Sequence, residues 1–395
     1  MLYGANEAEE ATVLTLVENG EVYTPDPVGK QQVLLTDGKI AKVGPVDRGA
    51  IESIGVEYEV IDATGCIVTP GFIDPHAHLL GGSGENGFAT QTPEFFIGEL
   101  VPFGITSVVG TLGVDTTMKT MAGLLAKAKA LKEQGLNAYI WTGGYNVPPT
   151  SIMHSVRDDI MFLEEVIGTG EIAISDLRGM NASSTELARV VTDTYVGGML
   201  SKKAGVTHFH VGEAERRLEP LRQILNEHDI KPECVYPTHV QRNEKLMSEA
   251  VELAKGGCTI DVDTIEEDLA KWFRFYLDAG ADPACMTASS DASISSPRVL
   301  SEQVRACVTE HGFALEQVLP LVTRNTARIL KLELKGTLEK GKWGDLLLLE
   351  KGTLDIVHVL SRGVVMVRDG APVVQERFLG ESKRAIHLVG KESRE

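Results

Sequence analysis

The alternation of apolar and polar residues predicts β-structure at both ends of the chain. Near the start, short strand-like runs bounded by turn residues lie at 12–16, 32–36, 39–43 and 59–62. Near the end, similar runs lie at 345–349, 356–361 and 364–367. Asp37-Gly38, between two of these runs, is typical of a hairpin turn. Neither set has enough strands to be stable alone, so we expect one small β-sandwich domain built from residues 1–68 and 336–395.

The middle of the chain alternates strand-like with helix-like patterns. The strand-like segments lie at 67–78, 107–111, 138–142, 171–176, 206–211, 235–240, 258–262 and 286–291. Amphipathic runs lie between them at 115–135, from 184 onward, and at 215–228, 245–255 and 267–278. Eight such units in about 265 residues match a (β/α)8 barrel, so we expect an α/β fold with a TIM-like barrel at 69–335. A doubly wound open sheet is the alternative, but no G-x-G-x-x-G fingerprint follows the first strand.

Composition limits the partners and the location of the protein. With 395 residues, 43% of them hydrophobic, the chain can bury a large core. Its net charge of -18 argues against binding to nucleic acid or to an anionic membrane. It has no run of about 18 apolar residues and no signal-peptide pattern, so we expect no membrane association. Five cysteines without a C-x-x-C pair are typical of reduced thiols, and we expect a cytoplasmic protein.

Residues able to bind a metal occur on several of the expected barrel strands. His76 and His78 end the first strand, and residues i and i+2 of a strand point to the same face. Further candidates belong to later strands: Glu171, His210, His239 and Asp291. Active sites of such barrels lie at the carboxyl ends of the strands, where these side chains would meet. Imidazole and carboxylate groups together suit a metal such as zinc.

The histidines also have structural explanations. His76 and His78 can face solvent, and His239 taken alone can equally be structural. His208 shares a face with His210 but lies one layer deeper, where a packed and hydrogen-bonded histidine is more common. We therefore take His210 as the ligand. The remaining histidines lie in helix or sandwich contexts and are expected to be structural: His154, His228, His311, His358 and His387.

The other polar candidates can likewise be explained without a site. Asp291 can cap the helix that is expected to begin near Ser295. Tyr145 can pack in a proline-rich loop, and Arg178 and Arg242 can be surface charges. Their coincidence at the same end of successive strands nevertheless favours one shared site.

The arrangement of these candidates follows a known pattern: His-x-His on the first strand, an acid on the fourth, histidines on the fifth and sixth, and aspartate on the eighth. It resembles the amidohydrolase superfamily and, more closely, the bacterial isoaspartyl dipeptidases. The stretches that carry the resemblance are 71–82 (GFIDPHAHLLGG), 106–110 (TSVVG), 142–145 (TGGY), 174–176 (ISD), 237–243 (PTHVQRN) and 289–291 (SSD). The resemblance covers nearly the whole chain.

The resemblance implies a site for two zinc ions. The implied ligands are, for the first ion, His76, His78 and Asp291 and, for the second, His210 and His239. A water between the metals would be the nucleophile, because the two cations lower its pKa. Asp291 would accept the water's proton and deliver it to the leaving amine. Tyr145 would donate a hydrogen bond to the carbonyl oxygen as negative charge develops there.

The implied substrate is a β-aspartyl dipeptide, a small molecule with one ammonium and two carboxylates around the scissile isopeptide bond. Glu85 would bind the ammonium, and Arg178 and Arg242 would each take one carboxylate in a forked geometry. Ser295 matches a serine of the family that also contacts the substrate. The resemblance further implies a homo-oligomer, for example an octamer.

Two positions depart from the family pattern. The isoaspartyl dipeptidases bridge their metals with a carboxylated lysine, but this chain has Glu171 there and no lysine between Lys132 and Lys202. Because its side chain is shorter, either the backbone moves inward, using the extra residue in 168–171, or the second metal binds weakly. We favour the first alternative, in which Glu171 bridges the two zinc ions. The second departure is Val114, where the family has threonine, so that one hydroxyl near the substrate is lost.

Three functions are compatible with the sequence. The first is hydrolysis of β-aspartyl dipeptides. The second is hydrolysis of another amide, such as an N-acyl amino acid or a cyclic amide, although a neutral cyclic amide would leave Glu85, Arg178 and Arg242 unmatched. The third is a scaffold protein without catalysis, which the retention of four histidines and Asp291 disfavours.

Overall fold

Eight parallel strands form the middle of the protein, whose computed structural model describes residues 14–383. The strands are β8 (Phe72–Ala77), β9 (Ile105–Gly110), β10 (Asn137–Thr142), β11 (Val166–Ile174), β12 (Thr207–Val211), β13 (Val235–Thr238), β14 (Ile260–Asp263) and β15 (Met286–Ser289). Six of them form one sheet in the order β13-β12-β11-β10-β9-β8, and β14 pairs with β15. A backbone hydrogen bond of 2.8 Å from His78 to Ala292 joins the end of β8 to the segment after β15. The curled sheet therefore fits the TIM-type barrel expected from the sequence.

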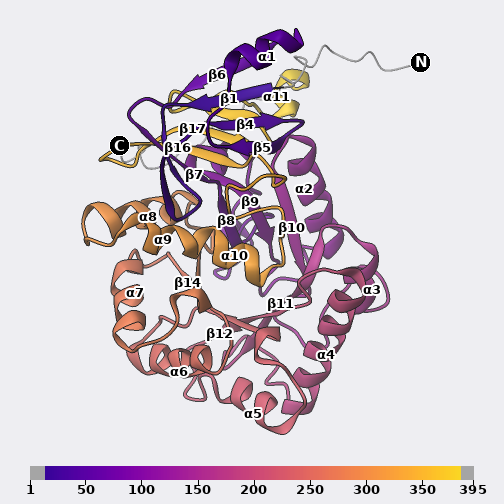
Figure 1. Ribbon diagram of the computed structural model, residues 1–395. Coiled ribbons are helices and arrows are strands. Elements are labelled where there is room, and N and C mark those ends of the chain that lie inside the picture. Colours follow the sequence, from indigo (N-terminus) through magenta and orange to yellow (C-terminus); the bar gives the residue numbers. More distant parts are fainter. Residues whose placement is uncertain (1–13, 384–395) are drawn as a thin grey trace.

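Helices surround the barrel strands (Figure 1). They are α2 (Met121–Glu133), α3 (Val156–Phe162), α4 (Ser184–Ser201), α5 (Glu219–Glu227), α6 (Glu244–Lys255), α7 (Leu269–Asp278), α8 (Arg298–Thr309), α9 (Leu315–Val322) and α10 (Arg324–Ile329). Short 3-10 turns lie at Phe88–Thr90, Ile97–Glu99, Val101–Phe103, Pro232–Cys234 and Pro283–Cys285. Ser183 and Glu186 form a capping box that begins α4 close to the expected position.

The helix expected from residue 115 begins later, at α2. The side chain of Thr120 accepts a hydrogen bond from the Gly123 amide and so caps this helix. Asp115 instead accepts bonds of 2.9 Å from the amides of Thr117 and Met118, which makes a separate turn. The chain thus has two capping residues, Asp115 and Thr120, and the helix begins after the second.

Both ends of the chain contribute to two further sheets. Their strands are β1 (Leu14–Glu18), β2 (Glu21–Tyr23), β3 (Pro27–Lys30), β4 (Val33–Thr36), β5 (Lys39–Val43), β6 (Tyr58–Asp62), β7 (Cys66–Pro70), β16 (Leu346–Glu350), β17 (Ile356–Ser361), β18 (Val364–Arg368) and β19 (Ala371–Pro372). One sheet has the order β5-β4-β1-β6 and the other β19-β18-β17-β16-β7-β2-β3. Leu35 and Ile61 of the first share a buried apolar cluster with Val68, Leu348 and Leu360 of the second.

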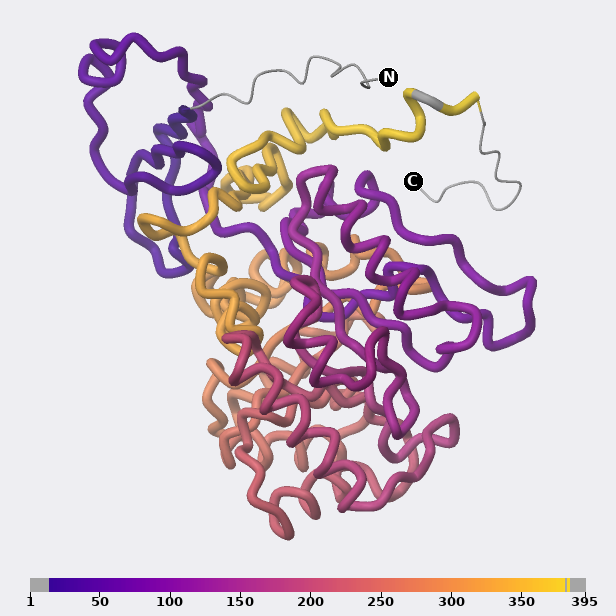
Figure 2. Tube along the Cα trace, turned by 90° about the vertical axis from the view of Figure 1, so that its right-hand side faces the viewer, coloured from indigo at the N-terminus to yellow at the C-terminus, as the bar shows by residue number. Residues whose placement is uncertain are grey.

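Two short helices accompany these sheets, α1 (Arg48–Ile54) and α11 (Arg377–Glu381). Figure 2 shows the indigo N-terminal part and the yellow C-terminal part at the same end of the molecule. The hairpin expected at Asp37-Gly38 is confirmed, since β4 and β5 pair antiparallel on either side of it. Residues 12 and 13 of the first expected strand lie outside the described residues.

The single strand expected at 67–78 is wrong, because the chain forms two strands in two different sheets. β7 pairs with β16 and β2, and β8 pairs with β9 in the barrel. The division falls at Gly71, where a Cβ atom would lie 2.2 Å from Oγ1 of Thr106. Glycine therefore permits the close approach at which the chain leaves one sheet and enters the other.

Several other boundaries differ from expectation. β11 begins at Val166 instead of 171, because its first residues, rich in glycine, still pair with β10. Several short elements were not expected, each with ten residues or fewer and little periodic signal: the strands β2, β3 and β19 and the helices α1, α3, α9, α10 and α11. Among the described residues 14–383, no helix is long and apolar enough to cross a membrane.

Candidate metal centre

Six side chains converge at the carboxyl ends of the barrel strands. They are His76 on β8, His78 just beyond it, Glu171 on β11, His210 on β12, His239 after β13 and Asp291 after β15. They form three overlapping groups, in each of which one ligand atom from every residue lies within 4.8 Å of the others: His76, His239 and Asp291; His76, His78 and Glu171; and Glu171, His210 and His239. The structure thus brings together all six residues that the sequence proposed as metal ligands.

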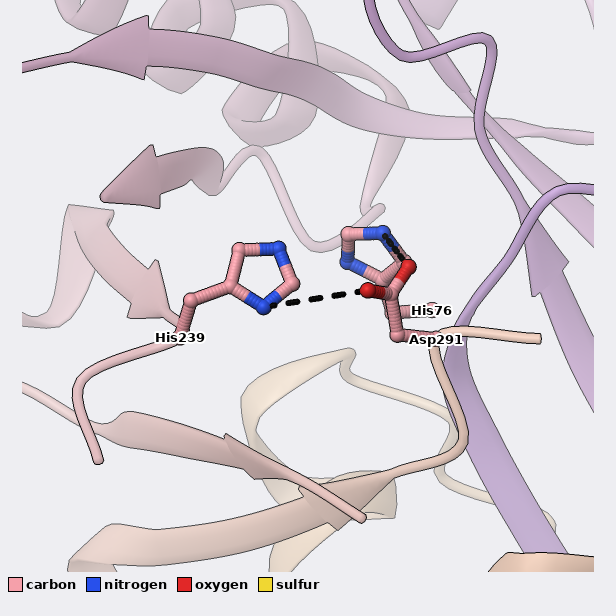
Figure 3. Close-up of side chains that lie close together, drawn as sticks. All are labelled: His76, His239 and Asp291. Carbon is pink, nitrogen blue, oxygen red and sulfur yellow. Dashed lines mark ion pairs between the residues drawn. The ribbon is translucent and has the colours of Figure 1, made fainter. Parts of the chain in front are cut away.

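Asp291 occupies the middle of one half of this cluster. Its Oδ1 atom lies 3.2 Å from Nε2 of His76 and 3.2 Å from Nε2 of His78. Figure 3 shows its carboxylate between the rings of His76 and His239, whose Nδ1 is 3.9 Å from Oδ2. Asp291 and His239 both have left-handed backbones, with φ of 44° and 62°. Such values are uncommon outside glycine and concentrate at functional sites.

Glu171 spans the two halves of the cluster. Its Oε1 atom lies 3.5 Å from Nε2 of His76 and 3.6 Å from Nε2 of His78. Its Oε2 atom lies 3.1 Å from Nδ1 of His210 and 3.7 Å from Nε2 of His239. Each carboxylate oxygen therefore faces one pair of histidines, as a bridging ligand does.

An irregularity in β11 places Glu171 at this position. Thr169 pairs with Thr207 and Ile172 with Phe209, so β11 uses three steps where β12 uses two. This is the signature of a β-bulge, which inserts one residue and redirects a side chain. The register shift overlaps the stretch 168–171 in which the sequence suggested an extra residue, and the inward movement of the backbone stays a prediction.

Three buried atoms of the cluster lack the hydrogen bonds that buried polar atoms normally make. Nε2 of His76, Nδ1 of His78 and Oε1 of Glu171 are enclosed and have no hydrogen-bond partner in the described part of the chain. Buried polar atoms are satisfied in more than about 90% of cases, so such orphans call for a ligand. Imidazole nitrogen and carboxylate oxygen are the donors that zinc and related divalent cations accept. The residues therefore fit a metal site.

The protonation of these groups is strongly coupled. Burial lowers the pKa of His76, but the carboxylates of Glu171 and Asp291 outweigh it and raise that pKa well above its ordinary value. For His239 the same balance, with Asp291 and Asp263 as main partners, raises the pKa to about 9. Burial opposes ionisation of Glu171, yet His76 and His210 hold its pKa well below the usual range. The cluster thus favours positive charge at its centre, and a divalent cation can replace these protons.

Three of the histidines also have a partner outside the six-residue cluster. Nε2 of His210 is 3.0 Å from Oδ2 of Asp176, and Nδ1 of His239 is 2.7 Å from Oδ2 of Asp263. Nδ1 of His76 is 2.8 Å from Nε2 of His208. Partners of this kind fix which ring nitrogen carries the proton and how the ring is oriented.

Tyr145 lies beside the cluster and is almost fully buried. Its hydroxyl is 2.9 Å from Nδ1 of His210. Burial, together with the nearby Glu171, raises the pKa of Tyr145 well above its ordinary value. The hydroxyl therefore stays protonated and can donate a hydrogen bond.

Arg178 and Glu85 meet at the same side of the site. Nη1 of Arg178 lies 2.7 Å from Oε1 of Glu85, and Nη2 lies 2.8 Å from Oδ2 of Asp176. The guanidinium carbon is 5.3 Å from the centre of the Tyr145 ring. The two expected substrate-binding residues thus contact each other beside Tyr145.

Arg242 and Ser295 occupy the rim of the same end of the barrel. Nε of Arg242 donates a bond of 3.0 Å to the Val211 carbonyl, and Nη1 lies 3.7 Å from Oε1 of Glu213. Oγ of Ser295 donates to the Asp291 carbonyl at 3.4 Å. Arg242 follows His239 by three residues and Ser295 follows Asp291 by four, but their role toward a substrate stays a prediction.

Comparison with known proteins identifies the family. A sequence profile described as "Amidohydrolase family" matches residues 67–374, most of the chain. The chain belongs to this family. The crystal structure of a β-aspartyl dipeptidase from Fervidobacterium islandicum AW-1 is similar, with 37% identity, a TM-score of 0.87, and 91% of this chain and 98% of that chain covered. A second structure of that enzyme, in complex with the β-Asp-Leu dipeptide, matches with 36% identity and a TM-score of 0.85 over 91% and 98% of the two chains.

Other relatives within the amidohydrolase family are more distant. An adenine deaminase of Halalkalibacterium halodurans is 21% identical over 92% of this chain. The chain spans less than two thirds of the length of such curated relatives, 58% in the case of this deaminase. The resemblance to β-aspartyl dipeptidases inferred from the sequence is confirmed by the similar structures.

Sequence reasoning missed the groups that support the ligands. Asp263 was not found because the expected strand ended at 262, although Asp261 and Asp263 alternate on one face as a strand end requires. Asp176 precedes Arg178 by two residues in a stretch that carries the resemblance, but its contact with His210 depends on the fold. His208 was expected in the core, and it lies there fully buried.

Proposed function

We propose that this amidohydrolase is a metal-dependent dipeptidase that hydrolyses the isopeptide bond of β-aspartyl dipeptides. The observation that carries the proposal is Glu171, whose two oxygens face two separate histidine pairs. Arg178 lies 3.2 Å from Nε2 of His210 and pairs with Glu85, so that both charges needed to bind the ends of a dipeptide are present near the cluster. The similarity to the Fervidobacterium islandicum β-aspartyl dipeptidase, whose complex holds β-Asp-Leu, supports the same substrate class.

The donor set suits two zinc ions. His76, His78 and Asp291 would hold one, His210 and His239 the other, and Glu171 would bridge them in place of a carboxylated lysine. When bound, the two cations would supply a water of lowered pKa near neutrality. The ligand donors are of the types that zinc accepts.

The chain's own residues then handle charge and protons. Asp291, beside His76 and His78, accepts the proton of the attacking water and delivers it to the leaving amine. The hydroxyl of Tyr145, kept protonated by burial, donates to the carbonyl oxygen as it becomes negative. A donor placed for that purpose contributes about a hundredfold or more to the rate.

The remaining side chains hold the substrate's ends. The carboxylate of Glu85 binds the ammonium, and the guanidinium groups of Arg178 and Arg242 each take a carboxylate. Ser295, bonded to the Asp291 carbonyl, contributes a further hydroxyl at the rim. Val114 brings an apolar side chain where the isoaspartyl dipeptidases carry threonine, and it is expected to alter the preference for the leaving residue.

The experiment measures metal per protomer and hydrolysis of β-Asp-Leu on the same purified sample, with α-Asp-Leu, N-acetyl-leucine and a cyclic amide in parallel. Two metals and selective cleavage of β-Asp-Leu are the expected result. Bound metal with cleavage only of the other amides would favour the alternative amidohydrolase activity. Neither metal nor turnover would leave a scaffold protein as the explanation. An Ala variant of His239 should lose metal, whereas one of His154, exposed and outside the cluster, should not.

Three further expectations belong to the same proposal. We expect a cytoplasmic homo-oligomer such as an octamer, which light scattering of the purified protein measures. We expect the sheets from both chain ends to form one β-sandwich domain from residues 1–68 and 336–395 around the barrel of residues 69–335. Their shared apolar cluster supports that arrangement. A β-aspartyl dipeptide is the expected small-molecule partner, with no nucleic acid or membrane.

A further inference from the structure

His208 is a fully buried imidazole that the proposed chemistry does not use. It lies on β12, two residues before His210 and so on the same face of the strand. Its ring stacks on Trp141 at 5.0 Å between centroids and 19° between planes. The indole nitrogen of Trp141 is itself held by a 3.0 Å bond to the Pro75 carbonyl, next to His76. Trp141 therefore holds the His208 ring in a fixed plane.

Both ring nitrogens of His208 have partners. Nδ1 is 3.0 Å from the Tyr236 carbonyl oxygen, and Nε2 is 2.8 Å from Nδ1 of His76. A carbonyl oxygen only accepts, so Nδ1 of His208 carries a hydrogen and donates it. In a neutral ring Nε2 is then the acceptor, and Nδ1 of His76 donates to it. The free lone pair of His76 is thereby placed on Nε2, the atom that faces Asp291 and Glu171.

The residues that hold His210 and His239 differ in charge from His208. His210 is held by Asp176 and His239 by Asp263, both carboxylates. Within residues 14–383, no acidic side chain comes within ion-pair distance of His208, whereas every histidine of the cluster has one. A neutral ring can accept a hydrogen bond here without adding another buried anion, which would be costly to desolvate.

We propose that His208 is a positioning residue that fixes the tautomer and orientation of His76, so that Nε2 of His76 is presented to a metal. It is the neutral counterpart of the aspartates behind His210 and His239. The inference rests on the metal-binding part of the proposed function but not on the choice of substrate. Second partners of metal-bound histidines are worth about 10- to 100-fold in metal affinity.

Two substitutions of similar length separate the hydrogen bond from the packing. In His208→Gln the amide oxygen can reach the position of Nε2 and accept from His76. In His208→Met the side chain has a similar length but no strong acceptor there. A third variant, His208→Asn, can still donate to the Tyr236 carbonyl but is too short to reach His76.

The measurement is zinc affinity by competition with a chelator, together with metal per protomer and the unfolding temperature of each metal-free protein. We expect His208→Met and His208→Asn to bind zinc about 10- to 100-fold more weakly than His208→Gln, with all three metal-free proteins folded. Equal affinity across the three variants would overturn the inference. If His208→Met does not fold, the comparison of His208→Asn with His208→Gln decides in the same way.

The same experiment separates this inference from the proposed function. If the unsubstituted protein binds zinc and the variants bind it equally well, only the role of His208 is overturned. Unsubstituted protein that binds no zinc or other divalent cation would overturn the proposed function and the inference with it.

Discussion

The guanidinium of Arg178 lies 2.7 Å from the carboxylate of Glu85, so two groups expected to bind opposite charges of a substrate bind each other. Both side chains are substantially exposed, at 36% and 54%. An ion pair so exposed contributes little to stability, because water screens it. A ligand with one ammonium and one carboxylate can therefore replace the pair at small cost, and each residue keeps a partner of opposite charge.

Glu85→Gln should weaken substrate binding. The amide has no charge for the ammonium, and a hydrogen bond to a charged group is worth about 1.5–3 kcal/mol, or about 10- to 100-fold in kcat/KM. Steady-state kinetics with β-Asp-Leu should show the loss mainly in KM, with metal content unchanged. The matched control is Glu94→Gln, a half-exposed glutamate paired with Lys127, which should leave KM unchanged. An unchanged KM in Glu85→Gln would contradict the assignment.

Glu171→Gln should reduce metal binding while keeping the shape of the side chain. The amide removes the negative charge that faces both histidine pairs, and one of its two ends presents hydrogens instead of a lone pair. We expect fewer than two metals per protomer and loss of most activity, measured by elemental analysis and β-Asp-Leu turnover.

Glu165 provides the control for this substitution. It is nearly buried, directly precedes β11 and binds Lys129 and Lys132 away from the cluster. Glu165→Gln should retain the metal content of the unsubstituted protein. If Glu171→Gln also retained two metals, Glu171 would not be a bridging ligand.

Tyr145→Phe should slow the chemical step. Removal of one donor to a developing oxyanion lowers kcat by about 10²–10³. KM should change little, because the Tyr145 hydroxyl does not bind the charged ends of the substrate. The control is Tyr139→Phe, on strand β10, which ends three residues before Tyr145; for this variant kcat should be unchanged. A higher KM with unchanged kcat would assign Tyr145 to substrate binding instead of catalysis.

Local signals in the sequence located much of the fold. β5 lies where alternation and the Asp37-Gly38 turn placed it, at 39–43, because a hairpin depends on neighbouring residues only. The division of 67–78 at Gly71 could not be predicted, since it depends on the approach of Thr106 from another strand. An apolar run that is buried in two sheets has the same pattern as one long buried strand.

Those parts of the site that lie on one strand could likewise be predicted from the sequence. His76 and His78 could be paired from the two-residue period alone. The fit of Glu171 depends on a bulge between β11 and β12, and register between strands is not encoded in a local pattern. The contact between Glu85 and Arg178 joins loops 93 residues apart. Contacts of this kind need the assembled barrel.

Glu165 should make stability depend on pH. Burial alone would raise its pKa, but bonds of 3.1 Å from the ammonium groups of Lys129 and Lys132 lower that pKa below its ordinary 4.5. A carboxylate whose folded-state pKa lies below the unfolded value stabilises the fold above the unfolded value and loses that contribution as pH falls through the folded pKa. Because Lys129 is half exposed, we expect only about 1 kcal/mol at pH 7.

Denaturant unfolding of metal-free Glu165→Gln measures this contribution. The variant should be less stable than the unsubstituted protein at pH 7, and the difference should shrink as pH falls below about 4.5. The control is Glu164→Gln, whose carboxylate is 81% exposed and binds Lys132 only, so its effect at pH 7 should be much smaller. A difference for Glu165→Gln that stayed constant or grew toward acid pH would mean that packing, and not the two lysines, explains the loss of stability.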